Sequence, residues 1–258
     1  MDRQYAEQYR ELHQRHWWWR CRESLILRTL DQISHDQPLD SERQILDVGC
    51  GDGLFFDQLA RFGRVSGIEP DRDLVDPQGP HSERIHIGLL DSAFSTEKPL
   101  DWILMLDVLE HMNQPSVSLQ QARKLLRGGG KLIVTVPAFN CLWTRHDEIN
   151  HHQTRYRIGR LKQLVSDHGF VVESSRYFFH WTFPVKLLIR LKESLRSGDA
   201  QPPRVPSRPV NWVCHLFSVI EQRLLGRLPV PFGSSILLVA RRLAEEVEEN
   251  VNPPSVDE

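Results

Sequence analysis

The chain has few cysteines and no long hydrophobic run. Its cysteines are scattered over 258 residues, at Cys21, Cys50, Cys141 and Cys214. This spacing fits no metal-binding motif, and we expect the thiols to stay reduced in a cytosol. No stretch approaches the roughly 18 uninterrupted apolar residues that a membrane span needs. The charged first residues are not followed by an apolar run, so we expect no signal peptide and a cytoplasmic protein.

The chain also lacks an excess of charge of either sign. Its 32 lysines and arginines nearly balance 34 aspartates and glutamates, which gives a formal net charge of −2. Without an overall positive field, we expect no nucleic-acid partner. Hydrophobic residues make up 40% of the chain and charged residues 26%, as in ordinary globular proteins. The length is sufficient for one large domain with a substantial core.

Short apolar runs alternate with amphipathic segments through most of the chain. We expect strands at residues 44–48, 64–69, 84–88, 101–106, 130–137, 170–179 and 234–243. Helices are expected from near Leu54 to residue 62, and at residues 115–127 and 158–168. Buried strands rich in Ile, Leu and Val, separated by helices, predict an α/β fold with a seven-stranded, mostly parallel sheet and helices on both faces.

A different composition separates the last two expected strands. The expected division is an N-terminal helical segment, an α/β core, a helical insertion, a final core strand and a disordered acidic tail, at residues 1–43, 44–180, 181–233, 234–243 and 244–258. The insertion begins with a helix that carries Lys186, Arg190, Lys192 and Arg196 beside an apolar face. A proline-rich linker follows.

A second helix of the insertion, at residues 210–228, places six apolar side chains along one face: Trp212, Val213, Leu216, Phe217, Ile220 and Leu224. We expect both insertion helices to pack over the domain, with their charges in solvent. The alternative is peripheral contact of residues 184–228 with an anionic membrane, at its inner face.

The sharpest motif is ILDVGCGDG at residues 45–53. An apolar strand runs into Gly49, Gly51 and Gly53, at alternate positions. Glycines let the backbone turn tightly and approach a ligand where a Cβ atom would clash. The end of the first strand in such a sheet is a common crevice for nucleotide-like cofactors, so the motif predicts a cofactor site.

The details of this turn discriminate between cofactors. A dinucleotide motif requires its third glycine one residue later, where Leu54 stands. Asp47 and Asp52 also place negative charge beside the turn, which disfavours a pyrophosphate and suits a cationic ligand. The pattern favours a sulfonium nucleoside over NAD.

This motif closely resembles the first motif of class I S-adenosylmethionine-dependent methyltransferases. Further landmarks of that family follow in order, and the resemblance implies roles for them. Glu69 would accept both ribose hydroxyls, Asp91 would approach the adenine amino group, and the segment around Asp107 would lie near the methionine part. The implied cofactor contacts are Asp47, Gly49, Cys50, Gly51, Gly53, Glu69, Pro70, Asp91, Ser92, Leu106, Asp107 and His111.

A histidine-rich segment follows the fifth expected strand. It resembles a subgroup of these enzymes through Trp143, His146, Asp147, His152, Arg155 and Tyr156. The subgroup has a second basic residue where this chain has Thr154, which puts an anion contact there in doubt. In this fold the loop faces the transferred methyl group, so His152, held by Asp147, is the leading general-base candidate. His146 and His151 are the alternatives, and the pair can also be a simple loop brace.

The N-terminal segment contains HWWWR at residues 16–20. It resembles the aromatic lead segment of the same subgroup, which implies a lid over the cofactor. Trp19 would then close over the cofactor, and Arg22 or Arg20 would pair with the methionine carboxylate. The alternative is that the tryptophans only attach the helix to the sheet.

We therefore expect an S-adenosyl-L-methionine-dependent methyltransferase that acts on a small-molecule acceptor, with an O-methyl product first and an N-methyl product second. The insertion would roof the acceptor pocket and suit an acceptor with an apolar portion. We expect no metal, because the histidine spacing matches no metal motif. The alternatives are an NAD-type oxidoreductase, or a non-catalytic cofactor-binding or peripheral membrane assembly protein. The oligomeric state does not follow from the sequence.

Overall fold

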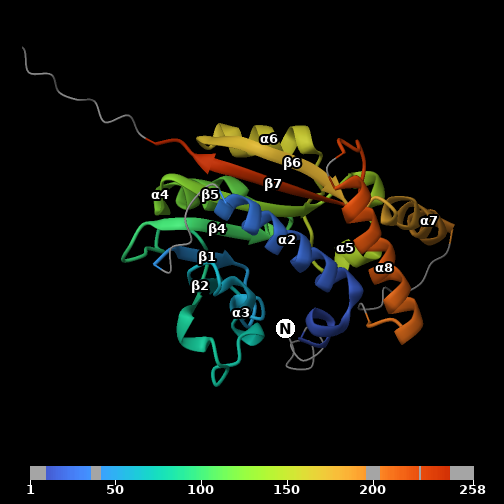
Figure 1. Ribbon diagram of the computed structural model, residues 1–258, viewed down its shortest axis with the longest axis horizontal. Helices are drawn as coiled ribbons and strands as arrows, with labels where there is room; N and C mark the ends of the chain where they lie inside the picture. Colours follow the sequence, from blue (N-terminus) through green and yellow to red (C-terminus); the bar gives the residue numbers. More distant parts are fainter. Residues whose placement is uncertain (1–9, 36–41, 196–203, 227, 245–258) are drawn as a thin grey trace, which may run out of the picture.

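Seven strands form one mixed sheet at the centre of the molecule (Figure 1). The computed structural model describes residues 10–35, 42–195, 204–226 and 228–244. The strands are β1 Gln44–Val48, β2 Arg64–Glu69, β3 Ile85–Ile87, β4 Leu100–Leu106, β5 Leu126–Pro137, β6 Phe170–Phe178 and β7 Ser235–Arg242. Their order is β3-β2-β1-β4-β5-β7-β6, and only β7 runs antiparallel to its neighbours. The predicted fold class is confirmed.

Helices cover both faces of this sheet. The described helices are α2 Trp17–His35, α3 Phe56–Leu59, α4 Pro115–Leu125, α5 Arg145–Ile149, α6 Ile158–Asp167, α7 Thr182–Leu195 and α8 Arg208–Leu225. Short 3₁₀ turns lie at η1 Arg72–Leu74, η2 Ser82–Arg84, η3 Leu109–His111 and η4 Asn140–Leu142. Apolar side chains of α4 and α6 pack in one core cluster, and those of α2 and α3 pack in a second. The sheet separates the two cores, as in a three-layer α/β domain.

The helix after the glycine turn is shorter than predicted. Instead of starting near Leu54, it begins at Phe56 and ends at Leu59. The preceding residues form tight turns, in which Gly53 N donates to Cys50 O and Phe56 N donates to Gly53 O. Gly51 and Gly53 both have a positive φ, so the right-handed helix can begin only after Gly53.

The tryptophan cluster attaches α2 to the sheet. Trp17 and Trp18 both lie beside the ring of Phe179, with centroids 5.7 and 5.8 Å away. Trp19 instead contacts the ring of His16 edge-on, at 5.3 Å. Trp17 and Trp18 thus attach α2 to the sheet, which is the alternative that was weighed against a lid. Residues 1–9 and 36–41 of the predicted lid segment lie outside the described residues.

The insertion helices are oriented differently from the prediction. Their apolar faces were expected to pack on the domain, but they point outward, and Trp212 and Leu188 are 64% and 65% exposed. Figure 1 places α7 and α8 at the same end of the molecule, with α8 beside α2. In the described parts of the chain, no helix combines the length and apolar character needed to cross a membrane. Residues 196–203 of the linker region and 245–258 of the predicted acidic tail lie outside the described residues.

Candidate functional site

The parallel strands bring the predicted cofactor residues to one edge of the sheet. Val48, the last residue of β1, pairs with Ile68 on β2 and with Met105 on β4. The glycine turn, Glu69 and Leu106 therefore follow at the same level on three adjacent strands. This edge lies at the carboxyl ends of the central strands, where ligands bind in open α/β sheets.

The glycine turn has a backbone that only glycine adopts easily. Gly49, Gly51 and Gly53 have φ angles of 70°, 54° and 70°. A Cβ atom on Gly49 would lie 2.8 Å from a methyl group of Val108. Gly51 N donates a hydrogen bond of 2.9 Å to Glu69 Oε2, which ties the turn to the end of β2. The turn is thus a tight cradle, as the sequence predicts.

Two buried carboxyl groups lie beside this cradle. Asp47 and Glu69 are 4% and 5% exposed. Burial raises the pKa of Asp47 to about 7, although Arg22 lowers it, and Glu69 raises it further. Burial also raises the pKa of Glu69, against hydrogen bonds from the backbone of Asp71 and Gly51. A cationic ligand would lower both values by favouring the charged carboxylates, so this edge suits a sulfonium group better than a phosphate.

Residues after β3 extend the same edge. Gly88 N donates to Glu69 O at 3.0 Å, so the segment that leads to Asp91 and Ser92 begins beside Glu69. Asp91 is partly exposed, and its Oδ1 accepts a hydrogen bond of 2.9 Å from Ala93 N. Because this carboxylate is partly exposed, it can also reach a ligand, and its contact with the adenine amino group stays a prediction.

Arg22 connects α2 to the end of β4. Its Nη2 donates to Leu106 O at 2.8 Å, and its Nε lies 2.5 Å from Asp107 Oδ2. Asp107 has a φ of 57°, an uncommon value for a residue with a side chain. To make its predicted contact, Arg22 would therefore have to bind the methionine carboxylate while its guanidinium also binds Asp107. The pairing of Arg22 with Asp107 has no local sequence signal, because the two residues lie on distant elements.

The histidine-rich segment folds around a fully buried carboxylate. Asp147, on α5, is 0% exposed. Its Oδ1 accepts hydrogen bonds from His152 Nδ1 at 2.7 Å and Arg155 Nε at 2.8 Å. Its Oδ2 accepts from Arg155 Nη2 at 2.9 Å and from Thr144 N at 2.8 Å. Burial alone would raise the pKa of Asp147, but the hydrogen bonds from His152 and Arg155 outweigh it and hold the pKa well below its usual range.

The three candidate histidines are placed very differently. His152 is held at Nδ1 by Asp147, which leaves Nε2 available to accept a proton. His146 lies on the exposed side of α5, where its Nε2 is 3.1 Å from Asn150 Nδ2. His151 is exposed and has a φ of 55°. Of the three, only His152 has its ring oriented by Asp147.

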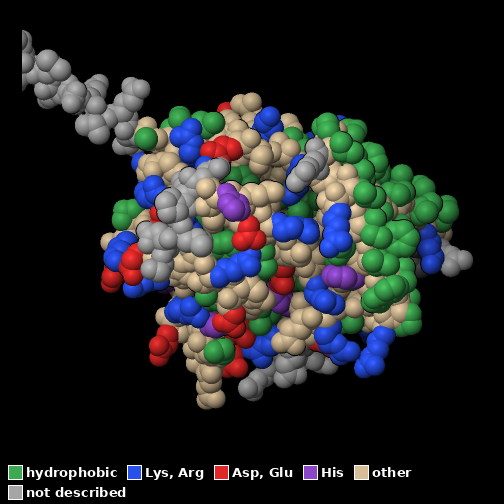
Figure 2. Space-filling view, viewed as in Figure 1, with side chains coloured by type: hydrophobic (Ala, Val, Ile, Leu, Met, Phe, Trp, Pro, Cys, Tyr) green, Lys and Arg blue, Asp and Glu red, His purple; other side chains and the backbone are tan. Residues whose placement is uncertain are grey.

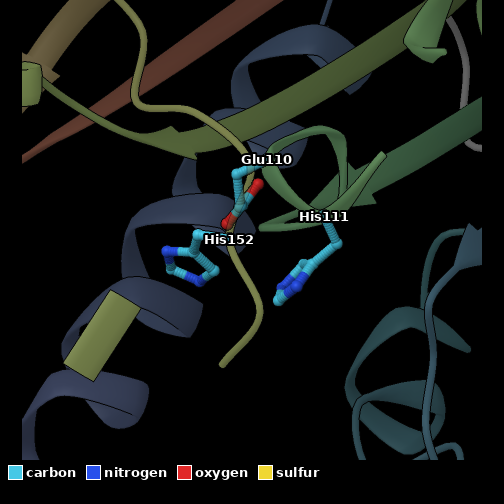
Figure 3. Close-up of side chains that lie close together, drawn as sticks. All are labelled: Glu110, His111 and His152. Atoms are coloured by element: carbon cyan, nitrogen blue, oxygen red, sulfur yellow. The ribbon is translucent and has the colours of Figure 1, made fainter. Parts of the chain in front are cut away.

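A second group of polar side chains meets His152 at the end of β4. Figure 3 shows His111 and Glu110, from the segment after β4, converging on His152. Their ligand-type atoms all lie within 4.8 Å of one another, and the two imidazole rings are 4.7 Å apart, edge to face. Glu110 is buried, and this burial together with the nearby Asp107 raises its pKa well above the usual range.

Two histidines and a carboxylate are also a set that can hold a divalent cation. The expectation of no metal did not consider this group, because Glu110 and His152 lie far apart in sequence. The absence of a metal remains a prediction.

A known protein family matches most of the α/β core of this chain. The model of a family described as a methyltransferase domain matches residues 18–175, which is more than half of the chain. The chain belongs to the methyltransferase-domain family. The fold of this domain is the Rossmann-like fold of class I, S-adenosylmethionine-dependent methyltransferases, so the family and the fold predicted from the sequence are confirmed.

Similarity to individual proteins is more distant. A ubiquinone biosynthesis O-methyltransferase of Xylella fastidiosa is 33% identical over 114 residues, which cover 41% of this chain and 46% of that protein. The chain thus spans less than half the length of this relative. A S-adenosylmethionine-dependent methyltransferase from Archaeoglobus fulgidus has the same fold, with a TM-score of 0.50 and 15% identity over 85% of this chain and 94% of that one.

A third comparison bears on the acceptor. Phosphoethanolamine N-methyltransferase 2 of Haemonchus contortus, solved with S-adenosyl-L-methionine, superimposes with a TM-score of 0.52 and 14% identity, over 84% of this chain and 52% of that one. Proteins similar to this chain in sequence or in fold are thus named for O- and for N-methylation. The fold of the methyltransferase domain does not select the acceptor atom.

Besides Glu110, Lys186 is a residue of this site that was not predicted from the sequence. Lys186 was expected to be solvated on the first insertion helix, but α7 turns it toward the domain, where it is partly buried. This burial lowers the pKa of Lys186 to about 8, with Arg155 adding to the effect and Asp147 and Asp107 opposing it. Which side of an amphipathic helix faces the domain depends on contacts outside the helix, so no local signal identifies this lysine.

Proposed function

We propose that this protein transfers the methyl group of S-adenosyl-L-methionine to a hydroxyl group of a small-molecule acceptor that has an apolar portion. An amine acceptor is the second choice. The observation that carries the proposal is the pairing of the glycine cradle and its acidic neighbours with an oriented histidine, His152, beside the end of β4. The name of the Xylella fastidiosa relative supports an oxygen acceptor.

The cradle residues fit the cofactor by their chemistry. Gly49 and Gly51 let the backbone approach a ligand, and Glu69 supplies a carboxylate for a vicinal diol. The buried Asp47 favours a positive charge nearby. When bound, the cofactor supplies an electrophilic methyl group on a sulfonium. The same acidity argues against the NAD-type alternative, whose pyrophosphate would be repelled.

His152 would remove the acceptor proton. The bound cofactor would supply the methyl carbon to the acceptor oxygen, and its sulfur would keep the electron pair of the C–S bond. The proton of the hydroxyl passes to Nε2 of His152, because Nδ1 is bound to Asp147. Asp147 stabilises the resulting imidazolium and fixes the ring, as the carboxylate does in other histidine-carboxylate pairs. Holding the hydroxyl in line with the methyl group supplies much of the remaining acceleration.

The proposal also includes peripheral contact with the inner face of a membrane through residues 184–228. An acceptor with an apolar portion partitions into or onto a bilayer, and an enzyme that lies there meets it at a higher local concentration. The outward apolar sides of α7 and α8 support this part of the proposal.

Calorimetry with S-adenosylhomocysteine and with NAD tests the cofactor assignment. We expect micromolar affinity for the former and none for the latter. Glu69→Gln should weaken binding by about tenfold or more, since it removes the charge from a hydrogen bond to the ribose. NAD binding, or full affinity in the variant, would contradict the assignment.

Methyl transfer is tested with labelled cofactor and a cell extract, followed by mass spectrometry of the labelled product. With an acceptor identified, His152→Gln should lower kcat by about 10²–10⁴-fold, as for loss of a general base, and leave S-adenosylhomocysteine affinity unchanged. His35→Gln is the matched control, because His35 is exposed at the end of α2. Equal effects of the two substitutions would assign His152 to bracing the loop.

A further inference from the structure

The helix α8 is attached to the domain by its polar side. Asn211 Oδ1 accepts a hydrogen bond from Trp17 N at 2.9 Å. About two turns further along α8, Ser218 Oγ accepts from Trp181 Nε1 at 3.0 Å. One turn beyond that, Glu221 Oε2 accepts from Trp181 N at 2.7 Å. These contacts fix the rotation of α8 about its axis. The apolar side therefore has to face away from the sheet.

The helix α7 is attached in the same way. Arg190 Nη1 donates to Trp143 O at 2.6 Å, and Glu193 Oε2 accepts from Arg145 N at 3.1 Å. Lys186 lies on this same inner side. A helix that packs on its own domain normally does so with its apolar side, so both insertion helices are reversed relative to the usual arrangement.

The reversal leaves a large apolar face in solvent. On α7, Leu188, Leu191 and Leu195 are 65%, 54% and 86% exposed. On α8, Trp212, Phe217 and Leu224 are 64%, 58% and 68% exposed. We call these six side chains and their immediate apolar neighbours the outward face. Figure 2 shows the hydrophobic side chains gathered over α8 and α7, with lysines and arginines beside them. Exposed apolar patches of this kind mark interaction sites.

The charges around the outward face indicate the kind of partner. The described acidic residues of α7 and α8 are Glu193 and Glu221, and neither is exposed, because both accept hydrogen bonds from the domain. The exposed charged residues of the two helices are Lys192, Arg208 and Arg223. An apolar face with cations and without exposed carboxylates matches a bilayer surface that contains anionic lipids.

A second copy of the chain fits this pattern less well. In a two-fold symmetric dimer the same patch contacts itself, which would bring arginines from both copies together. Trp212 adds to the argument for a lipid partner, because tryptophan side chains are enriched at the level of the headgroups, where one end of the ring is apolar and the other is hydrated.

We propose that the outward face binds the surface of a bilayer that contains anionic lipids, with α7 and α8 lying in the headgroup region. This inference specifies the membrane contact included in the proposed function. Its test requires neither cofactor nor acceptor, so its failure and a failure of methyl transfer are separate results.

The test is co-sedimentation of the whole protein with vesicles of phosphatidylcholine alone, and of phosphatidylcholine with about one third phosphatidylglycerol. We expect binding to the anionic vesicles and at least about tenfold weaker binding to the neutral ones. The double variant Leu188→Gln, Trp212→Gln should lose about tenfold or more in affinity for the anionic vesicles. Its thermal unfolding should match that of the unaltered protein, because both side chains are already in solvent.

A matched control substitutes two exposed apolar side chains outside the outward face, Val117→Gln and Leu243→Gln. We expect it to bind vesicles as the unaltered protein does. Failure to bind anionic vesicles, equal binding to both vesicle types, or equal losses in the two double variants would overturn the proposal. Sedimentation equilibrium without vesicles provides the last comparison: a dimer that only the first double variant dissociates would assign the outward face to a second copy.

Discussion

Replacing Asp147 by Asn should destabilise the protein strongly. Each oxygen of this fully buried carboxylate accepts two strong hydrogen bonds, one of them from the guanidinium of Arg155, which is 3% exposed. Whichever position the amide NH₂ takes, its two N–H donors face two other donors, where they would need acceptors. The substitution also leaves the charge of Arg155 buried without its partner.

Removing one member of a buried ion pair costs about 3–5 kcal/mol of unfolding free energy. Since a domain of this size loses roughly 2–4 °C in Tm per kcal/mol, the expected decrease is roughly 6–20 °C at pH 7. Calorimetry or circular dichroism of thermal unfolding measures it. Glu148→Gln is the matched control: it makes the same change at the next residue of α5, which is exposed, and should shift Tm by no more than about 2 °C.

The pH dependence of the difference is a second, independent check. The pKa of Asp147 in the folded protein lies below its value in the unfolded chain, so the stabilisation is fully present above about pH 4 and is lost as the pH falls. The stability difference between the unaltered protein and Asp147→Asn should therefore shrink by about 1.4 kcal/mol per pH unit in the acid range. A variant that melts like Glu148→Gln, or a difference that does not change with acid, would refute the reasoning.

Three further substitutions test other parts of the site. In calorimetry, Asp47→Asn should weaken binding of S-adenosylmethionine more than binding of S-adenosylhomocysteine, which lacks the sulfonium charge. Because the pKa of Asp47 is about 7, the affinity of the unaltered protein for the sulfonium should rise between about pH 6 and pH 8. Equal losses for both ligands would contradict this electrostatic role. Glu110→Gln should flatten the pH dependence of stability, because a carboxyl with a raised pKa makes the folded state lose stability as the pH rises above about 4.5. The free energy of unfolding in urea is measured against pH for the unaltered protein and for Glu110→Gln. If the two curves run parallel, Glu110 does not cause the pH dependence of stability. Gly49→Ala should cost about 1–3 kcal/mol in urea unfolding, because it combines a positive φ with a clash against Val108, whereas Gly159→Ala in the open helix α6 should cost nothing.

Local sequence signals were sufficient for the sheet and the glycine turn. Buried strands such as β1 and β4 are continuous apolar runs, and the glycines at residues 49, 51 and 53 require backbone angles that other residues resist. The order of these elements along the chain then limits the topology, because parallel strands need helical crossovers. The same strand order predicts that the glycine turn and Glu69 lie together at the carboxyl ends of the central strands.

Contacts between distant segments could not be predicted in this way. The hydrophobic periodicity of α8 identifies which side chains share a face, but not that Trp17 and Trp181 hold the opposite, polar side. Likewise, the ion pair of Arg22 with Asp107 joins two elements whose proximity only the folded sheet creates. The roles of His152 and the cofactor residues stay predictions until ligands are measured.

The position of β7 has a consequence for the order of folding. This strand lies between β5 and β6 and forms register pairs with both along its length, so β6 is an unpaired edge until residues 235–242 arrive. During synthesis, α7 and α8 leave the ribosome before that strand does. Their apolar sides are exposed at a stage when the sheet still has an open edge, which is a state prone to aggregation. Completion of the sheet is therefore a late, long-range step, and we expect a chain truncated before Ser235 to accumulate in aggregates.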